Sequence, residues 1–244
     1  MNTPHADPSP PLLRVHGLNA FYGRAHILFD VALQVGAGEV VALMGRNGAG
    51  KSTTMKAIMG LVSECHGDIV FDGRPIAGQD PYRISRAGIG YVPEDRRVFT
   101  ELTVLENLEV GRRPSRPDAP HWTTERLFRL FPNLGEMPDR PGGRMSGGEQ
   151  QMLTVARTLM GNPRLVLLDE PSEGVAPVIV EQMAHMIIEL KKQGLSVLLS
   201  EQNLPFAAAV SDRAYVLEKG QVKFAGTMAE LDADAAIRQQ YLAV

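Results

Sequence analysis

The chain has 244 residues, 44% of them hydrophobic and 22% charged, with a formal net charge of −3. This composition is typical of a globular protein and excludes disorder, collagen and coiled coil as the main state, while the charge excludes a basic field that would hold nucleic acid. One cysteine excludes a disulfide framework, and no apolar run approaches the roughly 20 residues of a membrane helix. We expect a soluble intracellular protein with no nucleic-acid partner.

The chain changes character near Leu12. Residues 1–11 contain four prolines and no apolar block, so we expect a disordered leader rather than a signal peptide. Residues 12–23 and 26–35 follow as two β-like pieces joined by a turn that contains glycine.

Three apolar runs, residues 40–45, 165–170 and 196–202, have the length of buried strands. A Gly-rich loop and a helical pattern follow the first run. Residues 178–194 lie between the other two and have helical periodicity that ends in two lysines and a glycine. This strand–helix–strand order predicts a parallel sheet.

The middle of the chain, residues 94–162, is polar and interrupted by proline and glycine, with helical stretches and no clear strand. We interpret it as a helical lobe inserted into an α/β core, and the absence of an internal repeat predicts one unit. The expected division is a single domain over 12–244, with core segments 12–93 and 163–232, the lobe 94–162 and a C-terminal helix over 233–244.

The segment GRNGAGKS, which starts at Gly45, fits the pattern G-x-x-x-x-G-K-[ST] between a strand and a helix. Its glycines let backbone N–H groups face phosphate oxygens, and the helix N-terminus adds partial positive charge. Lys51 supplies a charge for the β- and γ-phosphates, and Ser52 an oxygen for Mg²⁺. The predicted nucleotide-binding residues here are Gly45, Asn47, Gly48, Ala49, Gly50, Lys51, Ser52 and Thr53.

The run LVLLDE places Asp169 at the carboxyl end of a strand, where ligands collect in open α/β sheets. Asp169 is suited to hold Mg²⁺ directly or through water. Glu170 follows it and can polarise an attacking water as a general base. The alternative is a strand end followed by an ordinary turn.

The segment MSGGEQQ, residues 145–151, allows two interpretations. Ser146 and Glu149 have the spacing of a helix capping box, and apolar residues follow on one helix face. Gly147 and Gly148 also expose N–H groups at a helix start, which suggests a second phosphate site. Because one nucleotide already has its loop at Lys51, two such sites suggest two chains facing head to tail.

These three motifs, in this order, resemble those of the ATP-binding subunits of ABC transporters, over about residues 12–232. Within that family the chain is most similar to the second ATPase of branched-chain amino acid importers, on the phrases VPEDRRVFTELTVLENL, SGGEQQML, DEPSEGVAP and EQN. The resemblance implies an α/β fold: a P-loop NTPase core with a parallel sheet, an N-terminal antiparallel β subdomain and an inserted helical subdomain.

The resemblance also assigns further site residues. Tyr22 would stack on adenine, although an ordinary strand aromatic is the alternative. The family's glutamine at the lobe junction is Glu94 here, a possible Mg²⁺ or water acceptor, and the signature glutamine is Glu149. The switch histidine falls on Gln202, which could donate to the γ-phosphate without a cation's charge, and the family's aspartate after the magnesium strand falls on Ala176. These departures put in doubt how fast the site hydrolyses ATP.

By the same resemblance the chain is an ATPase that uses ATP and Mg²⁺, with Lys51, Glu170 and Gln202 as catalytic residues and Ser52, Asp169 and Glu94 at the metal. Its partners would be a second ABC ATPase in a heterodimer or a copy of itself, two permease subunits and, indirectly, a periplasmic binding protein. It would lie on the cytoplasmic face of the inner membrane. Residues 103–108 resemble the segment that touches a permease; a capped amphipathic helix explains them equally well.

Other functions stay open at this point. Importer ATPases for urea or short amides share many of these sequence motifs. A non-transport ABC ATPase with an assembly or clamp role is a second alternative. A non-hydrolysing ATP-binding module, suggested by Gln202, is a third.

Overall fold

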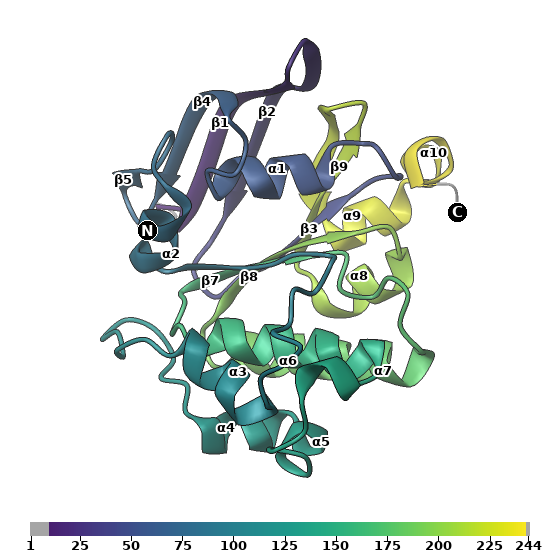
Figure 1. Ribbon diagram of the computed structural model, residues 1–244. Helices are drawn as coiled ribbons and strands as arrows, with labels where there is room; N and C mark the ends of the chain where they lie inside the picture. Colours follow the sequence, from purple (N-terminus) through teal and green to yellow (C-terminus); the bar gives the residue numbers. More distant parts are fainter. Residues whose placement is uncertain (1–9, 243–244) are drawn as a thin grey trace, which may run out of the picture.

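The computed structural model describes residues 10–242, so the leader expected over residues 1–11 lies almost entirely outside the described part. Two sheets and a group of helices make up this part (Figure 1). The antiparallel sheet has the strand order β2-β1-β4-β5. Its strands are β1 (Leu13–Tyr22), β2 (Ala25–Val35), β4 (Glu64–Phe71) and β5 (Arg74–Pro75).

The second sheet has the order β10-β9-β3-β8-β7-β6, and all its strands are parallel except β10. Its strands are β3 (Val40–Met44), β6 (Ile89–Val92), β7 (Leu165–Asp169), β8 (Ser196–Glu201), β9 (Arg213–Glu218) and β10 (Gln221–Thr227). The parallel sheet predicted from the three apolar runs is therefore confirmed. Those runs form its three central strands β3, β8 and β7.

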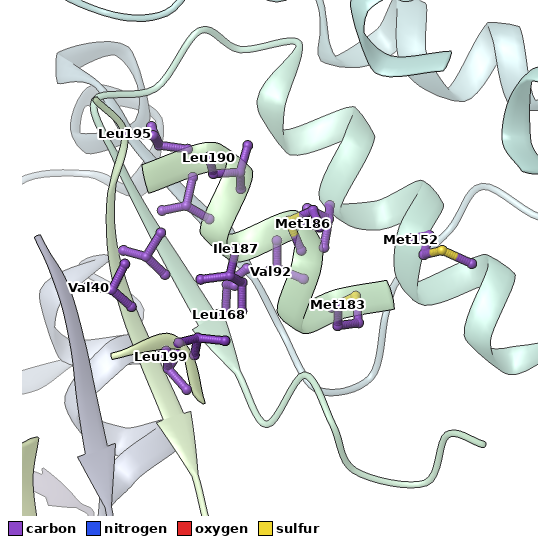
Figure 2. Packing of buried hydrophobic residues seen from close by; sticks show 14 of the residues in the cluster. Val40, Val92, Met152, Leu168, Met183, Met186, Ile187, Leu190, Leu195 and Leu199 are labelled. Atoms are coloured by element: carbon purple, nitrogen blue, oxygen red, sulfur yellow. The ribbon is translucent and has the colours of Figure 1, made fainter. Parts of the chain in front are cut away.

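Side chains of the central strands alternate between two cores, because successive residues of a strand point to opposite faces. Val40, Ala42 and Met44 of β3 pack in one core with helix α7 (Pro177–Lys192), where Met183, Met186, Ile187 and Leu190 are buried (Figure 2). Val41 and Leu43 pack in the other core with helix α1 (Lys51–Ile58) and the antiparallel sheet. Burial on both faces explains why these strands read as continuous apolar runs.

Residues 94–162 contain helices and, apart from one isolated bridge between Thr103 and Pro141, no β pairing. The helices are α3 (Val104–Gly111), α4 (Thr124–Leu130), α5 (Pro132–Gly135) and α6 (Gly147–Leu159), with a 3₁₀ turn at Gly142–Arg144. We call this region the helical lobe; it lies below the sheets in Figure 1, beside α7. Helix α2 (Pro81–Ala87) precedes β6, and α8 (Leu204–Val210) follows β8.

The C-terminal segment differs from the single helix expected over 233–244. Helix α9 (Met228–Ala233) starts earlier, because Thr227 and Glu230 form a capping box. The chain leaves helical geometry at Asp234, whose side chain caps the short α10 (Ala235–Ile237), and a π-helical turn follows at Arg238–Leu242. Among residues 10–242, no helix combines the length and apolar character required to cross a bilayer.

Candidate nucleotide-binding site

The loop between β3 and α1 has a backbone that only glycine adopts without strain. Gly45, Gly48 and Gly50 all have positive φ, and a Cβ on Gly45 would lie 2.4 Å from the carbonyl oxygen of Leu217. Helix α1 begins at Lys51, and its N-cap Gly50 has no side chain to cap it. The first N–H groups of α1 are therefore available to an anion, with the helix dipole behind them.

Lys51 is buried beside Glu170, with Nζ 2.9 Å from Oε1 of that carboxylate. Its Nζ also donates to the carbonyl oxygens of Gly45 at 2.7 Å and Arg46 at 3.2 Å. The ammonium is thus held in the mouth of the loop by three oxygens. A phosphate in this loop would face a positive charge whose position is already set.

Asp169, at the end of β7, accepts hydrogen bonds from three hydroxyl groups. Ser52 and Ser200 donate to Oδ1 at 2.9 and 2.7 Å, and Tyr91 donates to Oδ2 at 3.0 Å. Carboxylate and hydroxyl oxygens are the protein ligands that Mg²⁺ prefers. Ser52 and Asp169 therefore fit a magnesium ion. No cluster of three or more His, Cys, Asp or Glu residues of metal-binding geometry occurs within residues 10–242.

Glu170 and Gln202 meet at the ends of the neighbouring strands β7 and β8. Gln202 donates from Nε2 to Glu170 Oε2 at 3.3 Å and to Asn47 Oδ1 at 2.8 Å. Glu170 has a positive φ of 50°, and its N–H donates to Ser200 Oγ at 3.0 Å. A non-glycine residue in this conformation is strained, and here the backbone bond to Ser200 holds it.

A pocket of about 270 Å³ brings many of the predicted residues together. Tyr22 lies on its rim at the end of β1 and is 48% exposed, as an aromatic face that stacks on a base must be. Glu94 lines it from the segment after β6. The complete lining is Tyr22, Ile27, Asn47, Gly48, Gly50, Lys51, Ser52, Thr53, Glu94 and Glu170.

The segment that carries Glu94 is bonded to helix α6 of the lobe. Thr154 Oγ1 donates to the carbonyl oxygen of Arg96 at 2.7 Å, and Arg157 Nη2 donates to that of Arg97 at 2.6 Å. Both arginines of this turn have positive φ, 61° and 52°. Two side chains of α6 thus hold the strained turn next to Glu94.

Ser146 and Glu149 form the capping box that their spacing predicts. The Ser146 side chain accepts from Glu149 N–H, and Oε2 of Glu149 accepts from Ser146 N–H at 2.7 Å. Of the two glycines between them, Gly148 has a packing reason, whereas Gly147 faces only the movable end of an arginine side chain. A Cβ on Gly147 would lie 2.5 Å from Nη1 of Arg96, and one on Gly148 would lie 2.7 Å from Cγ1 of Ile179. None of these four residues lines the pocket around Lys51.

Comparisons with known proteins agree with this geometry. Residues 28–173, more than half of the chain, match the family described as ABC transporter. The branched-chain amino acid transport ATP-binding protein BraG of Pseudomonas aeruginosa is 42% identical over 95% of this chain and 99% of its own length. The chain belongs to the ABC transporter family. It is an ABC ATPase, which binds and hydrolyses ATP.

This ABC ATPase is also similar to an ATP-binding protein of an export system and to solved ATP-binding cassettes. The lipopolysaccharide export ATP-binding protein LptB of Haemophilus influenzae is 35% identical over 95% of this chain and 97% of its own length. An ATP-binding cassette of an ABC transporter, solved in its ADP conformation, superposes with a TM-score of 0.79 at 28% identity and covers 95% of this chain and 98% of its own. The fold class predicted from the motifs is confirmed.

Three site residues of this ABC ATPase escaped the sequence analysis: Tyr91, Ser200 and Glu201. Glu201 accepts from the N–H groups of Ser172, Gln202 and Asn203 at 3.0, 3.2 and 3.3 Å, and so joins the turn after β7 to the turn after β8. Burial raises the pKa of its carboxyl. The sequence feature that could have indicated Glu201 is its charge at the end of the otherwise mostly apolar strand β8.

Proposed function

We propose that this ABC ATPase is a subunit of an importer of branched-chain amino acids, in which hydrolysis of MgATP drives uptake through separate permease subunits. The observation that carries the proposal is the near full-length similarity to BraG, together with 37% identity to a probable branched-chain amino acid transport ATP-binding protein LivF of Archaeoglobus fulgidus. The phrases VPEDRRVF and SEQN, with Glu94 and Gln202 at family positions, support the same subfamily.

The pocket suggests how the residues divide the reaction. The loop over residues 45–50 and Lys51 bind the phosphates, Tyr22 stacks on adenine, and Ser52, Asp169 and Glu94 hold Mg²⁺. Bound Mg²⁺ would neutralise phosphate charge. Glu170 accepts a proton from the attacking water while Gln202 orients the γ-phosphate. Displacement of Lys51 Nζ toward phosphate oxygens frees Oε1 of Glu170 for that water.

The working unit is a head-to-tail dimer in which the start of α6 from one chain covers the nucleotide of the other. The separation of residues 146–149 from the pocket of their own chain supports this arrangement, because a contact between them must come from a neighbour. The neighbour is a second ABC ATPase, or a copy of this chain. The glutamine at 202, glutamate at 94 and alanine at 176 suggest two unequal sites in a heterodimer.

The permease subunits dock on the helical lobe, on the cytoplasmic face of the inner membrane. Thr103 and Glu106 form a capping box, so the structure explains the start of TVLENL without a partner. Exposed Leu105, Phe99 and Val110 on the same lobe support the docking role. Phe99 and Val110 also line a groove of about 330 Å³ between lobe and sheet.

Lipopolysaccharide export is the second candidate, because relatives named LptB are 34–35% identical over at least 91% of this chain. Uptake of urea or short amides is an alternative within the importer class. All three use the same ATPase site, so only the transported solute and the membrane partner separate them.

The deciding experiment reconstitutes the transporter. The tagged chain is purified from its host with its membrane partners, placed in proteoliposomes and supplied with a binding protein, and ATP-dependent uptake of labelled leucine and urea is measured. Glu170→Gln serves as the matched inactive control. Leucine uptake that this variant abolishes is expected; urea uptake alone, or co-purification with lipopolysaccharide export components and no uptake, contradicts the proposal.

A second measurement addresses the unequal sites. The ATPase rate of the purified chain is compared with that of its mixture with the partner ATPase. A much higher rate for the mixture is expected. Equal rates would contradict the heterodimer with unequal sites and favour a homodimer.

A further inference from the structure

Tyr91 lies on β6, at the edge of the parallel sheet and next to β7, and its hydroxyl reaches the Asp169 carboxylate. Oδ1 of Asp169 accepts from Ser52 and Ser200, whereas among residues 10–242 Oδ2 accepts only from Tyr91. The rotation of the carboxylate plane is therefore limited at one oxygen by two serines and at the other by one phenol. Loss of the phenol leaves that plane fixed at a single oxygen.

The direction of the Tyr91 bond follows from the protonation of its partners. An ionised carboxylate is an acceptor only, so the proton of this bond belongs to Tyr91. Burial and the nearby charge of Asp169 raise the pKa of the Tyr91 phenol above its ordinary value. Tyr91 is therefore the donor of this hydrogen bond and Oδ2 of Asp169 the acceptor.

Tyr91 lines two cavities. One is the groove of about 330 Å³ that it lines with Phe99, Val110 and Arg157. The other is a cavity of about 380 Å³ that it lines with Glu94 and Asp169. Tyr91 therefore contacts Asp169 from outside the nucleotide pocket, whose lining does not include it.

We propose that Tyr91 is a positioning residue of the ATPase reaction, which holds the Asp169 carboxylate in the orientation that Mg²⁺–nucleotide requires. Partners of this kind, which bond to a ligand of the metal rather than to the metal, typically change metal affinity about 10- to 100-fold when they are removed. Tyr91 acts on magnesium use and leaves the binding of the nucleotide base and of the metal-free phosphates unchanged. The inference rests on the proposed use of Mg²⁺ at Ser52 and Asp169.

The test compares Tyr91→Phe, which removes only the hydroxyl, with the wild-type chain. A fluorescent ATP analogue is titrated in EDTA and then across a range of Mg²⁺ concentrations. Tyr91→Phe should raise the Mg²⁺ concentration for half-maximal effect by about tenfold or more, with an unchanged Kd in EDTA. Saturating Mg²⁺ should restore binding and most of the ATPase rate.

Tyr215→Phe is the matched control. Tyr91 is half-buried and Tyr215 is buried, and the hydroxyl of Tyr215 accepts a hydrogen bond from the N–H of Gln34 at 3.0 Å. Tyr215 lies on β9, near the opposite edge of the same sheet from β6. This variant should lower the melting temperature without a change in Mg²⁺ dependence. A purely structural role of Tyr91 predicts the same behaviour for both variants, and that result would overturn the inference.

Asp169→Asn completes a double-mutant cycle. In that background Tyr91→Phe should cause no further change in Mg²⁺ dependence, because the charged carboxylate that it positions is gone. Equal effects of Tyr91→Phe in both backgrounds would also overturn the inference. If wild-type binding shows no Mg²⁺ dependence at all, the proposed metal site fails instead, so the two failures are distinguishable.

Discussion

The ammonium of Lys51 lies 2.9 Å from the carboxylate of Glu170, and both side chains are buried. The residue proposed to hold phosphate and the residue proposed to activate water therefore neutralise each other directly. A buried pair of this kind costs several kcal/mol when one partner is removed, because an uncompensated charge is left behind. In the proposed mechanism nucleotide competes with Glu170 for the ammonium of Lys51, so that binding of nucleotide frees the carboxylate of Glu170.

Glu170→Gln should separate these two effects. The variant removes the charge that competes for Lys51 and the base that accepts the water proton. We expect tighter ATP binding together with a loss of about 10²–10⁴ in hydrolysis rate. Fluorescent-nucleotide titration and phosphate release measure the two quantities, and Glu173→Gln is the control at a neighbouring carboxylate. Hydrolysis at the wild-type rate would exclude Glu170 as the base.

Gly148→Ala tests the packing at the start of α6. The new Cβ would lie 2.7 Å from Cγ1 of Ile179, and overpacking of this kind costs about 1–3 kcal/mol. Gly148→Ala with Ile179→Ala should recover both thermal stability and ATPase rate, because the Cβ of residue 148 points at Ile179. A stable but inactive double variant would show instead that nucleotide needs the bare glycine.

Asn162 should prove important for the order of residues 112–122. Its side chain accepts from Trp122 N–H at 2.7 Å and donates to Arg113 O at 2.8 Å, and its φ is +50°. Asn162→Ala leaves the buried N–H of Trp122 unpaired, at about 1–3 kcal/mol, removes the bond to Arg113 and adds backbone strain. Asn162→Gly loses the same side-chain hydrogen bonds as the alanine variant, but glycine adopts the positive φ without strain. Urea unfolding should therefore rank wild type above glycine and glycine above alanine; any other order contradicts this account.

Glu201 should make stability depend on pH in a defined direction. Burial raises the pKa of its carboxyl above the ordinary 4.5, although the N–H groups of Ser172 and Asn203 lower it in part. The folded state then binds more protons than the unfolded state, so stability falls as pH rises from about 4.5 through the raised pKa. Glu201→Gln should lose that slope. Unfolding free energies at a series of pH values measure it, and parallel curves for the two proteins would refute the assignment.

Sequence predicted the parts of the fold that depend on local pattern. The three apolar runs became β3, β7 and β8, and the glycine loop lies between a strand and a helix as its motif requires. The capping boxes at Thr103 and Ser146 follow from residues three positions apart. Thr227 and Glu230 carry the same pattern, which the expectation of a helix over 233–244 overlooked.

The surroundings of Asp169 could not be predicted in this way. Tyr91 and Ser200 reach it from β6 and β8, which flank β7 only because of the strand order in the sheet. Sequence separation of 78 and 31 residues gives no indication of these contacts. The packing of Gly148 against Ile179 is likewise a result of tertiary structure, and it gives a reason for glycine at this position that does not depend on phosphate binding.

The bonds from Thr154 and Arg157 to the turn at Arg96 and Arg97 have a mechanical consequence. Glu94, the first residue of the helical lobe, lines the nucleotide pocket, and the turn that follows it is bonded to helix α6 of the same lobe. A swing of the lobe that keeps these two bonds must carry one wall of the pocket with it. The shape of the nucleotide pocket therefore depends on the angle between the helical lobe and the two sheets.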